Sequence, residues 1–258
     1  MTFDRPALQE LFAGHVRSGV PLLGGWCTIP SLFAAEAMVM AGFDWICIDT
    51  QHGLIKGDVL AQMIVVCDLH RVPCIVRVGW NAPGEIMQAL DLGAAGVIVP
   101  NVETAEEVTA ATRACRYPPD GYRSWGLMRE TPSSKKALQP ANENTLCIPM
   151  IETAAAVGDL DRILQTPGLS AVFVGPNDLS LSTRGHISGA NEDQEDGEVM
   201  TVIVESCKRA NISVGIVCSP LDAPACAGRG FSLLGIAADA ALLREAARAS
   251  VEAARLSP

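Results

Sequence analysis

The 258-residue sequence predicts an α/β fold in which residues 1–258 form a single domain, a (β/α)₈ barrel of the TIM-barrel architecture. Its length is close to the ~250 residues typical of such a barrel. Aromatic residues make up only 5% of a chain that is 49% hydrophobic, which suits parallel strands buried on both faces by helices. Length alone would also allow two smaller domains, but no linker interrupts the pattern.

Short apolar runs alternate with helical patterns from one end of the chain to the other. This alternation implies parallel strands joined by right-handed crossovers. The eight predicted strands are Leu22–Ile29, Trp45–Asp49, Cys74–Val78, Gly96–Val102, Leu146–Glu152, Ala171–Val174, Ser213–Cys218 and Phe231–Gly235.

Helix starts are predicted from capping residues, whose side-chain oxygens accept one of the free backbone amides of the first turn. The predicted starts are Asp4 before a helix through Arg17, Ser31 before Leu32–Met40, Asn81 with Pro83, Thr104 with Glu107, Thr153 before Ala154–Leu164, and Ser219 with Pro220. The last predicted helix is Asp239–Leu256, and its apolar stripe consists of Leu242, Leu243, Ala246, Ala253 and Leu256.

Two segments lack a clear period. Tyr117–Asn144 is rich in proline, and a long irregular stretch inside a compact domain is often functional or at an interface. Gly185–Gly197 is polar and acidic, and we interpret it as a solvated loop. The acidic residues 192–198 match no motif.

Charge and cysteine content restrict the partners and the compartment. A formal charge of −10 without a basic patch argues against nucleic acid or an anionic membrane as a partner. The nine cysteines include no Cys-x-x-Cys pair, and we expect free thiols in a reducing compartment. The N-terminal residues lack a signal-peptide pattern, and no apolar stretch is long enough to span a bilayer. We therefore expect a cytoplasmic protein.

Reactive side chains follow four of the predicted strands. Asp49 and His52 follow the second strand, Arg77 lies in the third, Glu152 ends the fifth, and Asp178 follows the sixth. Barrel active sites are built at the carboxyl ends of the strands, so we expect these side chains at one rim. Each also has a structural alternative, as a turn residue, a helix cap or, for Arg77, a partner in a structural ion pair.

The two carboxylates of Glu152 and Asp178 suit a hard cation such as Mg²⁺ or Mn²⁺. No matching His or Cys ligands accompany these two carboxylates. Most of the octahedral coordination positions of the cation therefore remain for water and a chelating substrate. Paired carboxylates also serve glycosidases. An arginine and a histidine in the same site, and the scarcity of aromatic residues that could stack on sugars, argue against that class.

Six segments in the same order across nearly the whole chain resemble the HpcH/HpaI aldolase family, the pyruvate-dependent class II aldolases of hydroxy-keto acids. Any single segment is weak evidence for the resemblance, whereas six segments in the same order are strong evidence for it. The segments are Ala41–Trp45 through Asp49–His52, Val76–Arg77, Ala89–Pro100, Pro119–Ser124, Met150–Thr153 and Gly175–Ser180.

The resemblance implies a barrel whose last helix is exchanged between subunits of a homo-oligomer, in dimers that build hexamers. It implies that Glu152 and Asp178 bind a divalent cation, Mg²⁺ or Mn²⁺, with Co²⁺ as a further option. By the same resemblance, Arg77 stabilises an enolate, and His52, oriented by Asp49, acts as the base.

Further residues are expected to bind substrate on the same ground. Trp26 would line the pocket, and the backbone N–H of Asn177 would hold the pyruvate carboxylate. Arg123 and Ser124 would reach the distal end of the substrate, with a loop-anchoring salt bridge as the alternative. The sequence departs from the family pattern at Gln51 and Met150, where many members have Glu and Gln, and these changes could alter substrate preference.

The implied reaction is reversible retro-aldol cleavage of a 4-hydroxy-2-keto acid to pyruvate and an aldehyde. Alternatives on the same fold are decarboxylation of oxaloacetate and cleavage of a CoA ester, as in citrate-lyase β-type relatives, which generally lack the Asp-x-x-His element. A Schiff-base aldolase is disfavoured because no lysine lies among the strand ends. A phosphate-binding barrel enzyme is disfavoured because the segments after the seventh and eighth predicted strands lack a Gly-rich phosphate cradle. A non-catalytic metabolite-binding barrel is a further alternative, against which the intact polar residues argue. The sequence does not determine the aldehyde.

Overall fold

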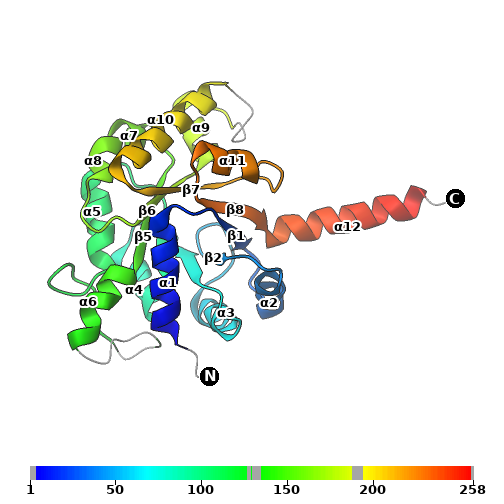
Figure 1. The fold of residues 1–258 in the computed structure, drawn as a ribbon. Helices are drawn as coiled ribbons and strands as arrows, with labels where there is room; N and C mark the ends of the chain where they lie inside the picture. Colours follow the sequence, from blue (N-terminus) through cyan, green and yellow to red (C-terminus); the bar gives the residue numbers. More distant parts are fainter. Residues whose placement is uncertain (1–3, 127–128, 130–134, 188–193, 257–258) are drawn as a thin grey trace.

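The strands of the computed structural model form a closed barrel in the order β1 to β8, and every neighbouring pair is parallel. The structure describes residues 4–126, 129, 135–187 and 194–256. Helices surround the barrel, and α1 (Arg5–Ser18) lies across one end of it (Figure 1). The predicted (β/α)₈ barrel is confirmed.

The observed strands lie where the sequence predicts them, and β2 and β6 have the predicted bounds. The strands are β1 (Leu22–Cys27), β2 (Trp45–Asp49), β3 (Cys74–Arg77), β4 (Gly96–Val99), β5 (Leu146–Ile151), β6 (Ala171–Val174), β7 (Ser213–Val217) and β8 (Leu233–Ala238). The predicted start of β8 was wrong because Gly230 ends the preceding helix in a left-handed conformation. The N–H of Phe231 then donates to the Cys226 carbonyl and keeps Phe231 in the turn.

Eleven further helices are present in the described part of the chain. They are α2 (Leu32–Met40), α3 (Gly57–Leu69), α4 (Pro83–Asp91), α5 (Ala105–Ala114), α6 (Lys135–Asn144), α7 (Ala154–Gly158), α8 (Leu160–Leu164), α9 (Pro176–Arg184), α10 (Gln194–Ala210), α11 (Ala223–Arg229) and α12 (Asp239–Leu256). Four predicted caps accept a first-turn amide, namely Asp4, Ser31, Thr104 and Thr153, and Thr104 forms the predicted capping box with Glu107.

Two predicted helix starts or spans were wrong. The helix after Thr153 breaks into α7 and α8 at Asp159, whose carboxylate accepts the Ala105 N–H at 2.8 Å. Ser219 forms a turn in which its hydroxyl accepts the Asp222 N–H at 3.2 Å, so α11 begins later than predicted. The predicted start at Pro83 is confirmed, since Pro83 is the first residue of α4.

The two segments that lack a sequence period both contain helix. The proline-rich segment ends in α6, and α10 begins at Gln194, so the polar segment predicted as a loop through Gly197 is helical at its end. Residues 192 and 193 lie outside the described residues. Acidic residues are also favoured in the first turn of a helix, so the polar composition that suggested a loop is equally compatible with a helix start.

Alternate strand residues point into the barrel and pack against α1, as the two-residue period of a strand requires. This interior cluster consists of Phe12, Ala13, Val16, Leu22, Trp26, Trp45, Cys47, Ile75, Ala95, Ile98, Leu146, Ile148, Met150, Ala171, Phe173 and Leu233. Gly24 and Gly215 leave room for the large rings, since an added Cβ would lie 2.3 Å from Trp45 and 2.4 Å from Phe173. The barrel is therefore packed beneath its carboxyl rim and closed by α1 where the strands begin.

The cysteines take no part in cross-links. All nine are free, and all but Cys218 are buried, which agrees with the expected free thiols. Burial raises the pKa of the Cys207 thiol to about 12, so this thiol stays protonated near neutral pH. Among the described residues, no helix combines the length and the apolar character needed to cross a bilayer.

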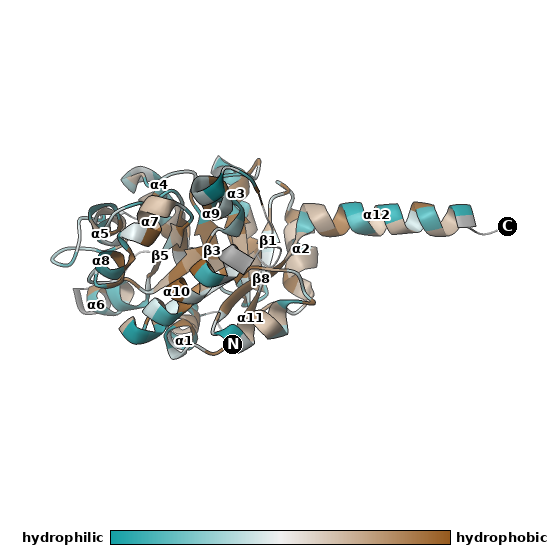
Figure 2. Ribbon diagram, turned by 90° about the horizontal axis from the view of Figure 1, so that it is seen from above, coloured by the Kyte–Doolittle hydropathy of each residue, from teal (hydrophilic) through white to brown (hydrophobic). Residues whose placement is uncertain are grey.

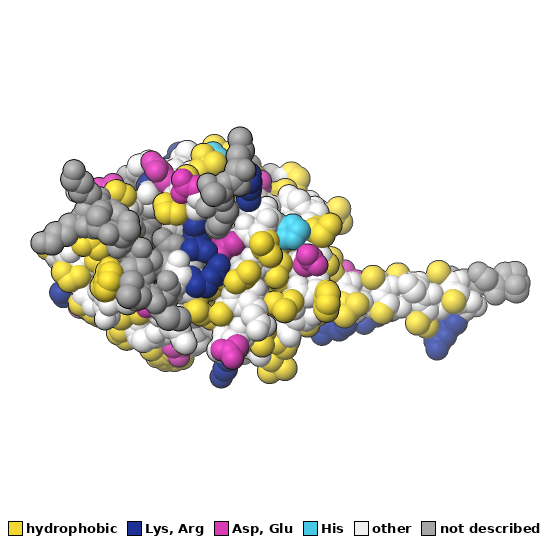
Figure 3. All heavy atoms as spheres, turned by 90° about the horizontal axis from the view of Figure 1, so that it is seen from below, with side chains coloured by type: hydrophobic (Ala, Val, Ile, Leu, Met, Phe, Trp, Pro, Cys, Tyr) yellow, Lys and Arg dark blue, Asp and Glu magenta, His cyan; other side chains and the backbone are white. Residues whose placement is uncertain are grey.

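The last helix, α12, leaves the barrel and projects into solvent (Figures 1 and 2). Leu243 and Val251 are exposed on it. Figure 3 shows hydrophobic side chains along this helix and basic side chains along one edge. Four residues of the predicted apolar stripe are thus exposed on α12, namely Leu242, Leu243, Ala246 and Ala253.

Candidate active site

The side-chain alternation of the strands carries three charged groups to the same end of the barrel. Cys47 in β2, Ile75 in β3 and Met150 in β5 belong to the interior cluster. Asp49, Arg77 and Glu152 each follow one of these residues by two positions. They therefore continue the inward-facing rows of side chains at the carboxyl rim. This convergence was predicted from the sequence.

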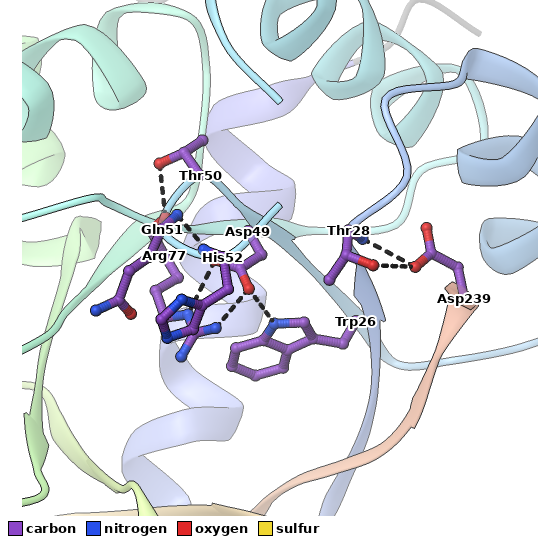
Figure 4. Close-up of polar contacts among 8 residues, drawn as sticks. All are labelled: Trp26, Thr28, Asp49, Thr50, Gln51, His52, Arg77 and Asp239. Atoms are coloured by element: carbon purple, nitrogen blue, oxygen red, sulfur yellow. Dashed lines mark hydrogen bonds and ion pairs between the residues drawn. The ribbon is translucent and has the colours of Figure 1, made fainter. Parts of the chain in front are cut away.

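Asp49 and Arg77 form a bidentate ion pair on neighbouring strands (Figure 4). Arg77 Nε donates to Asp49 Oδ1 at 3.0 Å, and Nη2 donates to Oδ2. Asp49 is 1% exposed. Burial alone would raise the pKa of Asp49, but the hydrogen bonds and charge of Arg77 outweigh it and hold this pKa below its ordinary value. Asp49 is therefore ionised at neutral pH.

Trp26 supports this pair from β1. Its indole Nε1–H donates to Asp49 Oδ2 at 3.2 Å, and the Arg77 guanidinium lies 5.2 Å from its ring centre. Trp26 also packs on Phe173 with a ring separation of 5.6 Å. The indole is almost fully buried and packs beside the ion pair.

The β2 loop that carries His52 is held by its backbone. Asp49 Oδ1 accepts the N–H groups of Gln51 at 3.0 Å and His52 at 3.2 Å, and Thr50 Oγ1 donates to the Arg77 carbonyl at 2.8 Å. No hydrogen bond joins Asp49 to the exposed imidazole of His52 among the described contacts. Asp49 thus fixes the position of the His52 backbone, whereas the sequence suggested that it orients the ring.

Glu152 is the second buried carboxylate of the rim, with 2% exposure. Its Oε1 accepts the backbone N–H of Asn101 at 2.6 Å, and Asn101 adopts a left-handed conformation with φ of 52°. Burial raises the pKa of Glu152, the Asn101 hydrogen bond opposes this, and the nearby negative charge of Asp178 raises it further. A buried carboxylate with a second carboxylate nearby is a common arrangement for binding a cation.

The surroundings of Glu152 leave space for such a cation. Gly175, between β6 and α9, passes so close that an added Cβ would lie 2.7 Å from Glu152 Oε2. Asp178 lies in the first turn of α9 and is exposed. No group of three or more His, Cys, Asp or Glu side chains forms a metal site within the described residues. Two oxygen ligands fit Mg²⁺ or Mn²⁺, which usually retain water or bind substrate oxygens.

The N-terminus of α9 offers backbone donors beside Glu152. Gly175 precedes the helix without a side-chain cap, and Pro176 at its first position has no N–H. The next amides, of Asn177 and Asp178, are in the first turn, where intrahelical acceptors are absent. These amides and the helix dipole favour an anionic group such as a carboxylate.

Arg123 is not part of this rim. Its Nη2 donates to Asp91 Oδ1 at 2.8 Å, its guanidinium lies 4.6 Å from the Tyr117 ring centre, and it is 4% exposed. Asp91 ends α4, and helices of the barrel end where the next strand begins, at the opposite end from the carboxyl rim. Arg123 therefore anchors its loop, and the exposed neighbour Ser124 is carried to that same end.

Two contributing residues were missed by sequence reasoning. Asn101 aims its N–H at Glu152, and the only local signal was its position after Pro100 at the end of β4. Asp239, at the start of α12, accepts the Thr28 N–H at 2.9 Å, the Thr28 hydroxyl at 2.8 Å and the Ile29 N–H at 3.0 Å (Figure 4). Asp239 thereby joins the start of α12 to the segment that follows Trp26.

Comparisons with known proteins identify the family to which the chain is similar. Residues 26–246 match the family model described as HpcH/HpaI aldolase/citrate lyase. A hydroxypyruvate/pyruvate aldolase of Rhizorhabdus wittichii is 36% identical over 92% of this chain and 95% of its own length. A 2-dehydro-3,6-dideoxy-6-sulfogluconate aldolase of Pseudomonas putida is 36% identical over 88% of this chain and 89% of its own.

A solved structure gives the same result for the fold. An HpcH/HpaI aldolase/citrate lyase family protein from Burkholderia cenocepacia superposes with a TM-score of 0.88 at 30% identity. The alignment covers 95% of this chain and 99% of the other.

We predict that Asp49→Asn destabilises the protein by about 3 kcal/mol at neutral pH, because it leaves the Arg77 charge buried without its partner. The native pKa of Asp49 lies below the ordinary value of 3.8. The stabilisation that the Asp49 carboxylate gives the wild-type protein is therefore fully present above pH 3.8. It is lost as the pH falls through the native pKa of Asp49, so the cost of Asp49→Asn shrinks in acid. Urea unfolding between pH 7 and pH 3 measures this difference.

The exposed Asp44, which accepts only the Leu23 N–H among its described contacts, supplies the control Asp44→Asn. Its cost should be smaller at neutral pH. Equal costs for the two variants, or a difference that does not narrow in acid, would contradict the prediction.

Proposed function

The chain belongs to the HpcH/HpaI aldolase/citrate lyase family, and on that premise we propose that it is a divalent-metal-dependent aldolase. Its proposed reaction is the reversible cleavage of a 4-hydroxy-2-keto acid to pyruvate and an aldehyde. The observation that carries the proposal is the convergence of Arg77 and the Glu152–Asp178 pair on one rim. A carbon–carbon cleavage that leaves an enolate needs positive charge at the keto oxygen, and these groups supply or bind it.

Arg77 is suited to stabilise the developing oxyanion. Asp49 occupies Nε and Nη2, and no described residue accepts a hydrogen bond from Nη1. Burial lowers the pKa of Arg77, but the hydrogen bonds and charge of Asp49 more than offset this and raise it. The guanidinium is therefore permanently charged and held still, so it needs no reorganisation as negative charge forms on the substrate.

Glu152 and Asp178 would hold the divalent cation. When bound, such a cation supplies a Lewis acid for the keto and carboxylate oxygens of the substrate. The Asn101 N–H keeps Glu152 Oε1 in place, and Gly175 leaves room beside Oε2. The amide of Asn177 adds a donor for the substrate carboxylate at the N-terminus of α9.

His52 is the proposed base. It accepts the proton of the C4 hydroxyl as the C3–C4 bond breaks, and the C4 hydroxyl becomes the aldehyde carbonyl. The electron pair of the broken bond forms the C2–C3 double bond of the enolate, whose oxygen Arg77 stabilises. Protonation at C3 then gives pyruvate. The His52 ring is exposed to solvent, and its backbone is fixed by Asp49. The ring can therefore exchange its proton with water.

We also propose that α12 packs on a second copy of the chain. Leu242, Leu243 and Ala246 lie on one side of this helix, while Arg244 and Arg248 lie on the other, as a 100° step per residue places them. An apolar helix face projecting from a barrel is stabilised when another surface covers it. Exchange of α12 between identical subunits would supply that surface.

Metal removal tests the proposal. Pyruvate release from a panel of 4-hydroxy-2-keto acids, coupled to lactate dehydrogenase, should stop with EDTA and return with Mg²⁺ or Mn²⁺. Glu152→Gln should weaken Mn²⁺ binding, measured by calorimetry, by more than the about 10–100-fold typical of losing a group that only supports a ligand. The exposed Asp161 on α8 supplies the control Asp161→Asn, which should bind Mn²⁺ like the wild type.

The proposal fails if no panel member and no oxaloacetate yields pyruvate from the metal-loaded protein. Undiminished Mn²⁺ affinity in Glu152→Gln would reject the metal site alone.

Replacement of the base should separate proton transfer from metal binding. We predict that His52→Ala lowers kcat by about 10²–10⁴-fold because a positioned general base is lost. Mn²⁺ affinity should not change. His70→Ala is the control, because His70 follows the end of α3 and pairs with Glu36 away from the rim. A loss of Mn²⁺ affinity in His52→Ala would argue against the assigned role.

The α12 interface is tested by Leu243→Glu, which places a charge on the apolar face. We expect the wild type to sediment as an oligomer and the variant to shift to smaller species in analytical ultracentrifugation, since burying an unpaired charge is costly. Arg248→Glu, on the opposite face, should leave the distribution unchanged. A monomeric wild type would contradict the proposed exchange of α12.

A further inference from the structure

Gln51 is the polar side chain of the β2 loop that the protein leaves without a partner. Its Oε1 is buried and accepts no hydrogen bond in the described structure. Its backbone N–H donates to Asp49 Oδ1 at 3.0 Å. A buried acceptor without a donor costs free energy, so such a group is expected to bind water or a ligand.

Two neighbouring donors are already engaged with other acceptors. Trp26 Nε1 donates to Asp49, and Thr50 Oγ1 donates to the Arg77 carbonyl. Figure 4 shows the Gln51 amide extending to the same side of the loop as the Arg77 guanidinium and the His52 ring. A substrate bound between Arg77 and His52 would therefore meet the Gln51 amide beside its reacting carbons.

The backbone of Gln51 is fixed before any ligand arrives. The Asp49 carboxylate holds the N–H groups of both Gln51 and His52, and the N–H of Thr50 donates to the Arg77 carbonyl at 2.9 Å. A side chain on a backbone fixed in this way loses little freedom when it binds a ligand, which favours selectivity.

We propose that Gln51 is a specificity-determining residue that binds a hydroxyl group on a carbon of the bond that forms or breaks, or on the carbon next to it. This inference rests on the proposed aldolase function. The Oε1 atom accepts the hydroxyl hydrogen, and the amide Nε2 remains able to donate to a hydroxyl oxygen. A methyl group at the same place would leave Oε1 unpaired, so the hydroxylated substrate is preferred.

The hydroxyl could belong to either reaction partner. It could lie on C2 of the acceptor, as in glycolaldehyde, or on C3 of the keto acid donor, as in hydroxypyruvate. Both place a neutral hydroxyl next to the new carbon–carbon bond, whereas the substrate's anionic groups are matched by Arg77 and the bound cation. Two arms of one experiment distinguish these sources.

The experiment measures kcat/KM for aldol formation by the metal-loaded full-length protein. In the first arm, pyruvate reacts with glycolaldehyde or with acetaldehyde. In the second arm, acetaldehyde reacts with hydroxypyruvate or with pyruvate. We expect wild-type protein to prefer the hydroxylated compound in one arm, and Gln51→Leu to reduce that ratio by about ten- to a hundredfold, the effect of losing one hydrogen bond at a buried group.

Two further variants separate hydrogen bonding from shape. Gln51→Glu keeps an acceptor oxygen, so it should retain more of the hydroxyl preference than Gln51→Leu does. Gln62→Leu, at an exposed position on α3, is the matched control and should keep the wild-type ratio. Circular dichroism and thermal unfolding of each variant verify that it is folded.

A ratio that is the same in Gln51→Leu and in the wild type, in both arms, overturns the assignment of Gln51 while leaving the aldolase function intact. An equal loss of preference in Gln51→Leu and Gln51→Glu also overturns it, because shape rather than an acceptor would then be responsible. The proposed function has a separate test in the exchange of the pyruvate methyl hydrogens with D₂O. Absence of both exchange and aldol products overturns the function and the Gln51 assignment with it.

Discussion

The rim of this barrel depends on the buried ion pair between Asp49 and Arg77. An arginine at the end of a buried strand is costly unless its charge is matched, and the carboxylate on the adjacent strand matches it in a bidentate geometry. The same carboxylate accepts the Trp26 indole N–H and the backbone amides of Gln51 and His52. One side chain thus fixes the proposed oxyanion donor Arg77, the Trp26 indole and the loop that carries the proposed base.

The two ends of the barrel use charge for different purposes. Where the strands begin, Asp68 pairs with both Arg5 and Arg129 at 2.6 Å, and Asp91 pairs with Arg123. These pairs attach α1 and the proline-rich segment to the ends of α3 and α4. At the carboxyl rim, the charge of Asp178 raises the pKa of Glu152 and the charge of Arg77 lowers it. The pairs where the strands begin stabilise the fold, and the rim carboxylates are the groups to which the proposed function assigns the cation.

Asp239 links the exit of α12 to the rim. Its carboxylate takes three hydrogen bonds from Thr28 and Ile29, just beyond the strand that carries Trp26, and it also accepts the Ala240 N–H at the start of the helix. The direction in which α12 leaves the barrel is therefore tied to the segment that follows Trp26. These hydrogen bonds therefore connect the helix that carries the apolar face to the strand that leads into the proposed active site.

The sequence by itself determined the eight strands, four of the helix caps and the charged residues at the strand ends, because strand period, capping chemistry and the position of a charge after an apolar run are local properties. Asp49, Arg77 and Glu152 were predictable for that reason. Tertiary structure decided which atoms meet. The partners Trp26 and Asp49 are 23 residues apart, Asn101 and Glu152 are 51 apart, and Thr28 and Asp239 are 211 apart. Only the folded chain shows that Arg123 turns to the opposite end of the barrel and that Gln51 is left without a partner, since hydrogen bonds between distant segments form only after the barrel closes.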